Sequence, residues 1–429
     1  MRINRKRLVA DLSRLVQIPS WEECDTIARD VVAALREAGA RDAHIDKAGN
    51  VIGSLGRGGA GLLLNAHLDT VPPGDYAGDP YSGKVSAGKL LGRGASDDKG
   101  QMLTHLKSVE AWMATEGRLP MNLKFLIEGE EECGGHGTAE YVDSHRDRLA
   151  CDCVVVSDSA QFGPGKPAIT CGLRGIAYCE LLLKGPNRDL HSGSFGGGVA
   201  NPANALARML ASLIDDRGRI QIPGFYDDVV PLTEKQRARF AELPHDEAEY
   251  KKGIGVSDLA GEEGFTTLER LWARPTFDTC GLWSGYQGEG AKTVLPSLAG
   301  AKISFRLVPN QLPEKIVEGL RRKLAEVCPP GIQMELIVHH GARGVLVPED
   351  GPYTQAAARA IEEAFGVAPF YTREGGSIPI CVTFSEALGV DTLLLGCATP
   401  TGPGSCDLRY SFVVRQTGDA GWQIAIRKN

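Results

Sequence analysis

The sequence predicts an α/β protein of two domains, and three observations lead to this prediction. The chain has 429 residues, which is more than one hydrophobic core usually supports. Short, almost wholly apolar runs alternate with helical patterns in the first part, as in a largely parallel sheet covered by helices. From about Arg174 the strands instead alternate apolar and polar residues, which is typical of an antiparallel sheet with one polar face.

The first domain is expected to begin with helices and then to alternate strands with helices. Runs that are apolar at nearly every position are typical of strands buried on both faces. The expected helices are Arg7 to Val16, Ile27 to Ala38 and Gln101 to Met113, and the expected strands are Gly61 to Ala66, Leu123 to Ile127 and Val154 to Val156.

The second domain is expected to interrupt the first. GIAYCELLLKG and AGAKISFRLVP read as alternating strands, with a helix at Pro202 to Ile214 and a polar, charged segment from Phe225 to Arg270. Near Gly344 the helical and buried-strand patterns return, with a helix at Thr354 to Phe365 and a strand at Thr392 to Leu395. The predicted domains are therefore residues 1–173 with 345–429, and an inserted α+β domain of residues 174–344.

Composition excludes several classes of function. With 42% hydrophobic residues, 24% charged residues and a formal net charge of −7, the chain lacks the basic surface that binds nucleic acid. No stretch of 18 apolar residues could span a membrane, and the basic, amphipathic start lacks the features of a signal peptide, so we expect a cytoplasmic protein. The 11 cysteines form no CxxC pair, which argues against a disulfide framework or a zinc ribbon.

Acidic and histidine residues follow the apolar runs of the first domain. This set comprises His67, Asp69, Asp97, Glu131, Glu132 and Asp158, and His191 extends it into the second domain. The ligands of open α/β sheets lie just beyond the carboxyl ends of the strands. The placement therefore predicts a metal site, because such side chains gather the oxygen and nitrogen ligands that divalent ions use.

The residues of the HLD segment have complementary roles in this reading. Side chains two residues apart in extended chain point the same way, so Asp69 could accept a hydrogen bond from the far ring nitrogen of a metal-bound His67.

Two adjacent acids, Asp97 and Asp98, lie in the glycine-rich segment GRGASDDKGQ. Asp97 could bridge two cations with its two oxygens. The alternative for Asp97 and Asp98 is that both carboxylates only cap the helix that follows.

Three carboxylates in a row follow the strand that ends at Ile127. Adjacent side chains diverge, so one of Glu131 and Glu132 could bind metal while the other acts as general base on water. A solvated acidic loop is the alternative. His191 lies in the second domain, where it could stabilise an oxyanion from across a domain or subunit boundary, unless it is a structural histidine.

Taken together, these segments resemble the M20 metallopeptidases, closest to the branch of the cytosolic nonspecific dipeptidase and carnosinase. The segments that carry the resemblance occur in the family's order: HLDTVP, GRGASDDKGQ, EGEEECGG, SDS, GLRG, LHSGSFGG, GEGAKTVLPS, KISFRLVPNQ and REGGSIPI. They extend from about residue 10 to residue 395, and nine ordered motifs are specific for the family but much less so for the substrate.

The resemblance implies a two-zinc site, with manganese or cobalt possible in place of zinc, and a homodimer formed through the inserted lid and dimerisation domain. His67 and Asp158 would bind one ion, Asp97 would bridge both, and Glu132 would bind the other. Asp69 would orient His67, Glu131 would be the general base, and the Asp97–Asp98 peptide bond would be cis. His191 would reach the site of the partner subunit. Thr293, Arg306, His340, Gly376 and Ser377 would hold the substrate's carboxylate and backbone.

The implied function is hydrolysis of the peptide or amide bond of dipeptides or small peptides with a free C-terminal carboxylate, through a metal-bridged water and a glutamate base. Deacylation of N-acyl amino acids is the alternative within the family. The family's last metal-ligating histidine is missing, because no histidine follows His340. The second metal site is therefore expected to be weakened or empty, and a non-catalytic dimeric member is a further alternative. Cys397, Cys406 and Asp407 are candidate substitutes for the missing ligand.

Overall fold

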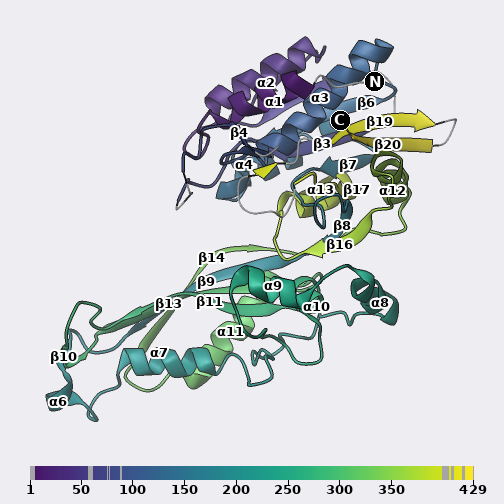
Figure 1. Ribbon diagram of the computed structural model, residues 1–429. Coiled ribbons are helices and arrows are strands. Elements are labelled where there is room, and N and C mark those ends of the chain that lie inside the picture. The colour runs from purple at the N-terminus through teal and green to yellow at the C-terminus, as the bar shows by residue number, and fades with distance from the viewer. Residues whose placement is uncertain are drawn as a thin grey trace. The chain divides into compact units, whose positions relative to one another are not determined.

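The chain forms two compact units in a computed structural model (Figure 1). The structure describes residues 5–56, 61–74, 76, 78–86, 89–398, 405–406, 410–417 and 421–428. Unit 1 comprises Met1–Cys171, Val347–Thr372 and Ile378–Asn429, and unit 2 comprises Gly172–Leu346 and Arg373–Ser377.

The sheet that organises unit 1 has its parallel strands at the centre. Its strand order is β1-β2-β6-β3-β7-β17-β8-β15, and β16 also pairs with β8. The neighbours β6, β3, β7 and β17 are mutually parallel, whereas β1, β2 and β8 pair antiparallel. These strands are β1 His44–Ile45, β2 Val51–Leu55, β3 Gly61–His67, β6 Asn122–Glu128, β7 Cys153–Val156, β8 Ala168–Leu173, β15 Val345–Leu346, β16 Phe370–Glu374 and β17 Asp391–Leu394.

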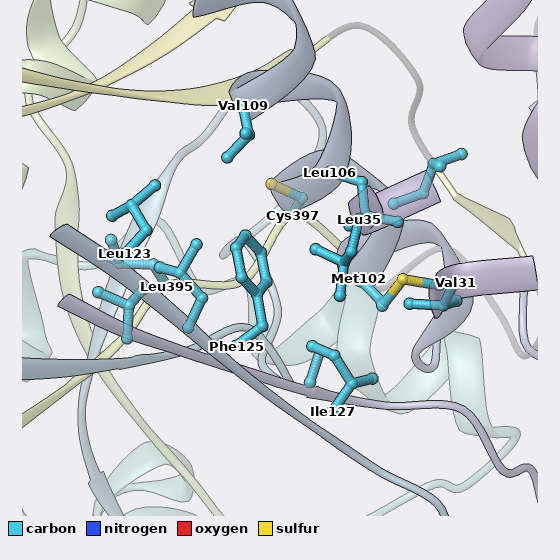
Figure 2. Packing of buried hydrophobic residues seen from close by; sticks show 14 of the residues in the cluster. Val31, Leu35, Met102, Leu106, Val109, Leu123, Phe125, Ile127, Leu395 and Cys397 are labelled. Atoms are coloured by element: carbon cyan, nitrogen blue, oxygen red, sulfur yellow. The ribbon is translucent and has the colours of Figure 1, made fainter. Parts of the chain in front are cut away.

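Both faces of the central strands are buried. Leu62 and Leu64 of β3 belong to one hydrophobic core, while Leu63 between them is buried away from that core. Helices α1 (Arg5–Val16), α2 (Asp25–Glu37), α3 (Lys99–Glu116) and α12 (Pro352–Phe365) contribute to the core. Figure 2 shows part of it, where Phe125 of β6 lies near Met102 of α3. The predicted largely parallel sheet with helical cover is thus confirmed, and its strands lie within one or two residues of the predicted positions.

Unit 1 contains several further elements. They are the helices α4 His136–Ser144, α5 Arg146–Leu149 and α13 Ile380–Leu388, the short 3-10 helix Glu131–Cys133, and the strands β4 Lys84–Ser86, β5 Lys89–Leu91, β18 Ser405–Cys406, β19 Tyr410–Thr417 and β20 Gly421–Lys428. Leu90 of β5 belongs to the same hydrophobic core. Ser405 of β18 pairs with Leu91 of β5, and β19 forms an antiparallel hairpin with β20.

Unit 2 is built on an antiparallel sheet with the strand order β11-β13-β9-β14. Alternate residues of β9, such as Cys179 and Leu181, pack in a hydrophobic core with α7 and α11, whereas Tyr178 and Glu180 belong to the opposite, more polar face. The elements are β9 Gly175–Lys184, β11 Thr276–Ser284, β13 Leu298–Leu307, β14 Gln333–Ala342, α7 Pro202–Ala211 and α11 Pro313–Val327. The expected antiparallel α+β unit is confirmed.

The polar segment before β11 contains three helices that the sequence pattern did not resolve: α8 Glu234–Glu242, α9 Glu247–Ile254 and α10 Thr267–Trp272. Thr266 and Glu269 form a reciprocal capping box at the start of α10. Strand β10 (Leu190–His191) precedes these helices in sequence and β12 (Val294–Leu295) follows them, and the two strands pair antiparallel in a short ladder. Helix α6 (Ser192–Phe195) directly follows β10.

Ten cysteines lie in the part of the chain whose side chains are described, and all ten are free thiols. Only Cys133 in unit 1 and Cys280 in unit 2 are exposed among these ten. Within the described residues, no helix combines the length and the apolar character needed to cross a membrane.

Candidate metal centre and substrate-binding residues

The parallel strands of unit 1 bring distant parts of the chain to one edge. Strand β3 ends at His67, and its parallel neighbours β6 and β7 end at Glu128 and Val156. The carboxyl ends of parallel neighbours share an edge, so the loops that follow them meet there. Asp97 joins them from the turn that precedes α3.

His67 is the centre of the cluster at this edge. Its Nε2 lies 2.9 Å from Oδ1 of Asp97 and 3.9 Å from Oδ1 of Asp158. His67 itself is 1% exposed, whereas the side chain of Asp97 is 62% exposed and that of Asp158 is 20% exposed, so the cluster opens to solvent on the side of Asp97. Donor atoms of His67, Asp97 and Asp158 all lie within 4.8 Å of one another, which is compact enough to hold a metal ion.

A second group of donors shares the same histidine. His67, Glu131 and Glu132 also place one donor atom each within 4.8 Å of the others. The two glutamates begin the 3-10 helix that follows β6. The carboxylate of Asp69 holds their backbone in place, because it accepts hydrogen bonds from the N–H of Glu131 at 3.1 Å and from the N–H of Glu132 at 2.8 Å. Nearly every carboxylate predicted from the sequence is therefore gathered here.

The charges of the cluster are unbalanced without a cation. Burial raises the pKa of Glu132 to about 7, and the charge of Asp97 adds to the effect. Burial likewise holds the pKa of Asp158 well above its usual range. Like charges brought this close need either protons or a positive ion. One imidazole nitrogen with several carboxylate oxygens is a donor set that zinc, manganese or cobalt accepts, so the residues fit a divalent metal centre.

Asp98 has a different role from the helix cap considered for it. No hydrogen bond from the helix N-terminus reaches its side chain. Its Oδ2 instead accepts the backbone N–H of His67 at 3.0 Å, and Asp98 is fully buried. The Asp97–Asp98 peptide bond is cis. Asp98 thus fixes the backbone of His67 while its neighbour faces the imidazole.

One pair beside the cluster was not predicted from the sequence. The buried Asn65 donates from Nδ2 to Glu128 Oε1 at 3.0 Å, and burial raises the pKa of Glu128 to about 7. Asn65 lies on β3 with His67, and Glu128 ends β6, the parallel strand that precedes Glu131 and Glu132. The only sequence signal was a polar residue within or directly after an apolar run of each strand.

Cys397 is the one candidate substitute for the missing ligand whose side chain the structure describes, and it lies in neither donor group. Cys397 is 1% exposed and belongs to the hydrophobic core, where Figure 2 shows it among apolar side chains. The hypothesis that Cys397 replaces the histidine is therefore wrong. Asp407 lies outside the described residues, as does the side chain of Cys406.

In unit 2, His191 and Thr293 are held side by side. His191 pairs with Val294 in the β10–β12 ladder, and Thr293 Oγ1 lies 3.1 Å from Nε2 of His191. Nδ1 of His191 accepts the backbone N–H of Gly193 at 3.1 Å, which places the proton of a neutral ring on Nε2. The Nε2–H of the exposed imidazole is therefore within hydrogen-bond distance of Thr293 Oγ1, which can accept it.

Arg306 and His340 lie on the same polar face of the unit 2 sheet. The ring of His340 stacks on Tyr178 with centroids 5.3 Å apart. Burial lowers the pKa of His340, and the charges of His339 and Arg306 add to the effect. Gly376 and Ser377 belong to the short piece of chain, Arg373–Ser377, that is part of unit 2, and the carbonyl of Gly376 accepts the N–H of Arg174 at 3.1 Å.

The fold and the carboxylate cluster define a class, that of α/β hydrolytic enzymes with a divalent metal centre beyond the carboxyl ends of parallel strands. The model of peptidase family M20/M25/M40 matches residues 63–409. The chain belongs to this family of metallopeptidases, as the sequence resemblance implied.

Similarity to curated relatives covers most of the chain. It is 34% identical over 377 residues to the Cys-Gly metallodipeptidase DUG1 of Candida albicans, covering 85% of this chain and 77% of that protein. It is 36% identical over 346 residues to the human Beta-Ala-His dipeptidase, covering 78% of this chain and 68% of that protein.

Solved structures show the same architecture. Human carnosine dipeptidase 1 superposes with a TM-score of 0.81 at 30% identity, covering 94% of this chain and 92% of that one. An M20 family metallo-carboxypeptidase from Sulfolobus solfataricus gives a TM-score of 0.84 at 29% identity, covering 94% and 95%.

Proposed function

We propose that this chain is a metallodipeptidase that hydrolyses the peptide bond of dipeptides or small peptides with a free C-terminal carboxylate. The observation that carries the proposal is the donor cluster around His67 at the carboxyl edge of the parallel strands. The dipeptidases among the relatives support the same reaction class. No nucleic acid or membrane partner enters this proposal.

In this proposal His67, Asp97 and Asp158 hold one divalent ion, and Asp97 with Glu132 holds a second. Zinc is the first choice, and manganese or cobalt also suits such donors. Bound ions would supply a Lewis acid that lowers the pKa of water and polarises the scissile carbonyl. Asp69 keeps His67 in the correct tautomer, because Nδ1 of His67 faces the oxygens of Asp69.

Glu131 is the proposed general base. Its backbone is fixed by Asp69, and burial raises the pKa of its carboxyl. A carboxylate with a raised pKa accepts the proton of the attacking water more readily than an ordinary one. Glu131 then returns that proton to the leaving amine, so the tetrahedral intermediate collapses to a carboxylate and a free amine.

His191 is the proposed oxyanion donor, acting in the site of a partner subunit in a homodimer formed through the inserted domain of residues 174–344. The Nε2–H of the neutral ring is the donor that such a role needs. Thr293 lies beside it and is proposed to contact the substrate.

Arg306 and His340, with Gly376 and Ser377, are proposed to hold the substrate's C-terminal carboxylate and backbone. A guanidinium binds a carboxylate through two parallel hydrogen bonds, which fits a reaction confined to chain ends. His340 lies near enough to Arg306 for the arginine's charge to lower the pKa of the histidine.

A substrate screen tests the proposal. The metal-loaded protein is assayed with dipeptides, with the same dipeptides amidated at the C-terminus, and with N-acetyl and N-succinyl amino acids. Hydrolysis of the free dipeptides that Glu131→Ala abolishes is expected. Preferred cleavage of the N-acyl amino acids would assign a deacylase instead. Absence of any hydrolysis sensitive to Glu131→Ala would favour the non-catalytic alternative, which the lack of a histidine after His340 suggests.

A further inference from the structure

Arg174, in the GLRG segment, has no role in the assignments above, yet its side chain is almost completely buried. The residue is 7% exposed and lies between β8 and β9 in unit 2. Its guanidinium donates from Nε to the carbonyl of Gly375 at 3.3 Å. Its backbone N–H reaches the carbonyls of Glu374 at 3.3 Å and Gly376 at 3.1 Å. Arg174 therefore forms hydrogen bonds to the turn at residues 374–376 through both its backbone and its side chain.

The other end of the guanidinium reaches helix α10. Nη1 of Arg174 lies 3.5 Å from the carbonyl oxygen of Arg270 and 3.4 Å from that of Arg274. Carbonyl groups at the C-terminus of a helix lack partners within the helix and carry partial negative charge. A buried cation there satisfies them, so Arg174 links the end of α10 to the turn.

Helix α10 is a firm support for this link. Glu269 within the helix accepts two hydrogen bonds from Arg237, at 2.7 Å and 3.0 Å. Arg274, just beyond the helix, donates to both carboxylate oxygens of the buried Glu262 at 2.7 Å and 2.8 Å. Paired charges in two-point contact keep a narrow geometry. Arg174 thus ties the turn to an element that is fixed from two other sides.

The turn lies directly on the guanidinium. A Cβ atom added at Gly375 would come within 2.8 Å of Nη2 of Arg174 and 3.2 Å of the carbonyl oxygen of Leu271. The backbone can approach this closely only because residue 375 is a glycine. The position of the turn therefore depends on the side chain beneath it.

A second guanidinium lies close to the first. Arg306 on β13 pairs with Ile176, two residues after Arg174. Burial lowers the pKa of Arg174 to about 10, and the charge of Arg306 adds to the effect. Two cations this near add their potentials, and both attract an anion that approaches Arg306, which is less buried than Arg174.

We infer that Arg174 is a positioning residue: it ties the Gly375–Gly376 turn to the C-terminus of α10 and so sets the place of Gly376 and Ser377 for binding the substrate's C-terminal end. The inference rests on the proposed function for its kinetic consequence. Arg174 itself touches backbone carbonyls and not substrate.

Two variants and two readouts test this. Arg174→Met removes the side-chain N–H donors that bind the carbonyl groups of the turn and of α10. Arg174→Lys keeps the positive charge but loses the planar guanidinium, which can bond to the turn and to α10 at the same time. KM for a free dipeptide should rise roughly tenfold to a hundredfold in Arg174→Met with kcat within about threefold of wild type, as expected for lost charged hydrogen bonds that act on binding. Arg174→Lys should recover part of this loss. Hydrogen exchange should accelerate in the peptides covering residues 267–275 and 370–378 of both variants.

Arg237→Lys is the matched control, because it loosens α10 from its other side without touching the turn. It should speed exchange in residues 267–275, but change KM and exchange in residues 370–378 much less than Arg174→Met does, because the hydrogen bonds from Arg174 to the turn remain. Unchanged exchange at the turn in Arg174→Met, unchanged KM in an active enzyme, or an equal rise of KM in Arg237→Lys would each overturn the inference. Exchange requires no turnover, so a wild-type protein without hydrolysis would refute the dipeptidase proposal alone.

Discussion

Nδ1 of His67 lies 3.0 Å from the backbone carbonyl oxygen of Asp69 and 3.3 Å from its carboxylate Oδ1. Both contacts favour a proton on Nδ1, which leaves Nε2 as the lone-pair nitrogen facing the carboxylates of the cluster. The same carboxylate accepts the N–H groups of Glu131 and Glu132. One side chain therefore orients the central histidine and positions the loop that carries both glutamates.

Replacing Asp69 by asparagine should weaken metal binding. Asparagine offers one acceptor oxygen in place of two, so the backbone N–H of either Glu131 or Glu132 loses its acceptor and the loop that carries both glutamates is less firmly held. Loss of a group that orients a ligand typically costs roughly 10-fold to 100-fold in metal affinity. Competition with a chromophoric chelator would measure it.

Asp46→Asn is the matched control, because Oδ1 of Asp46 also accepts two backbone N–H groups, those of Ala48 and Asn50 at 2.9 Å each. It does so away from the donor cluster. Equal metal affinity in Asp69→Asn and Asp46→Asn would contradict the orienting role.

Glu131 and Glu132 are neighbours with separable functions. Glu131→Gln should lower kcat by roughly 10²-fold to 10⁴-fold, the usual contribution of a general base, while metal content stays near that of wild type. Glu132→Gln should instead lose metal at the weaker position. Kinetics paired with elemental analysis of the dialysed proteins would separate the two. Parallel loss of metal in both variants would make Glu131 a ligand instead of a base.

The cluster should bind one divalent ion more tightly than a second. His67, Asp97 and Asp158 supply three donors to the first position, whereas no histidine is present after His340 to complete the second. Titration of the metal-free protein with zinc should give a tight phase near one ion per chain, which Asp158→Asn abolishes. Chelation should lower Tm, because the carboxylates then repel one another. Two equally tight ions per chain would contradict this.

His105 should make the protein sensitive to acid. Complete burial lowers the pKa of this imidazole from 6.5 to about 4. Between these values the unfolded chain binds a proton that the folded chain does not, so stability falls as pH decreases from about 6.5 to about 4. The contribution is on the order of 3 kcal/mol. This stability is fully present above about pH 6.5 and is lost as the pH falls to about 4.

Urea unfolding at a series of pH values would measure this slope. His105→Gln should flatten it, whereas His44→Gln, at the edge of the sheet, should leave it unchanged. An identical pH dependence in wild type and His105→Gln would assign acid sensitivity to the carboxylates alone.

The buried ion pair of Arg274 and Glu262 should matter far more than exposed ones. Their side chains are 9% and 7% exposed and form two hydrogen bonds. Arg274→Ala leaves the buried carboxylate of Glu262 with one remaining ion-pair partner, Arg219, whose Nη1 lies 3.2 Å away and whose side chain is 52% exposed. The expected cost is about 3 kcal/mol in the free energy of unfolding, the lower end of the range for a broken buried pair. Lys315→Ala removes an ion pair to Asp228 whose members are 45% and 36% exposed, and should change the free energy of unfolding far less, because solvent screens exposed charges. Similar unfolding curves for both variants would refute the distinction.

Much of the fold was predictable because the strands of unit 1 are buried on both faces. Such strands form uninterrupted apolar runs, so β3, β6 and β7 were recognisable, and the polar residues that end each run marked the site. Helices α8 to α10 were missed because their exposed faces leave few apolar positions. Their stability comes from caps and ion pairs, such as the Thr266 and Glu269 box, that a hydrophobic pattern does not show.

The roles of Asp98 and Cys397 could not be predicted for a different reason. Both depend on where a side chain points after a turn. Asp98 looked like a helix cap but accepts the N–H of His67, and Cys397 looked like a possible ligand but faces the core. Adjacent residues in a turn diverge, and only the folded backbone decides which direction each takes.

The contrast in cysteine exposure has a practical use. Cys133 directly follows Glu132 in unit 1, and Cys280 lies on β11 in unit 2. Apart from Cys406, whose side chain is not described, every other thiol is at least partly covered. Fluorescent maleimides should therefore mark one point on each unit. Energy transfer between the two dyes, measured on single molecules, would report the distance between the units in solution. The same measurement with substrate analogues would show whether they change that distance.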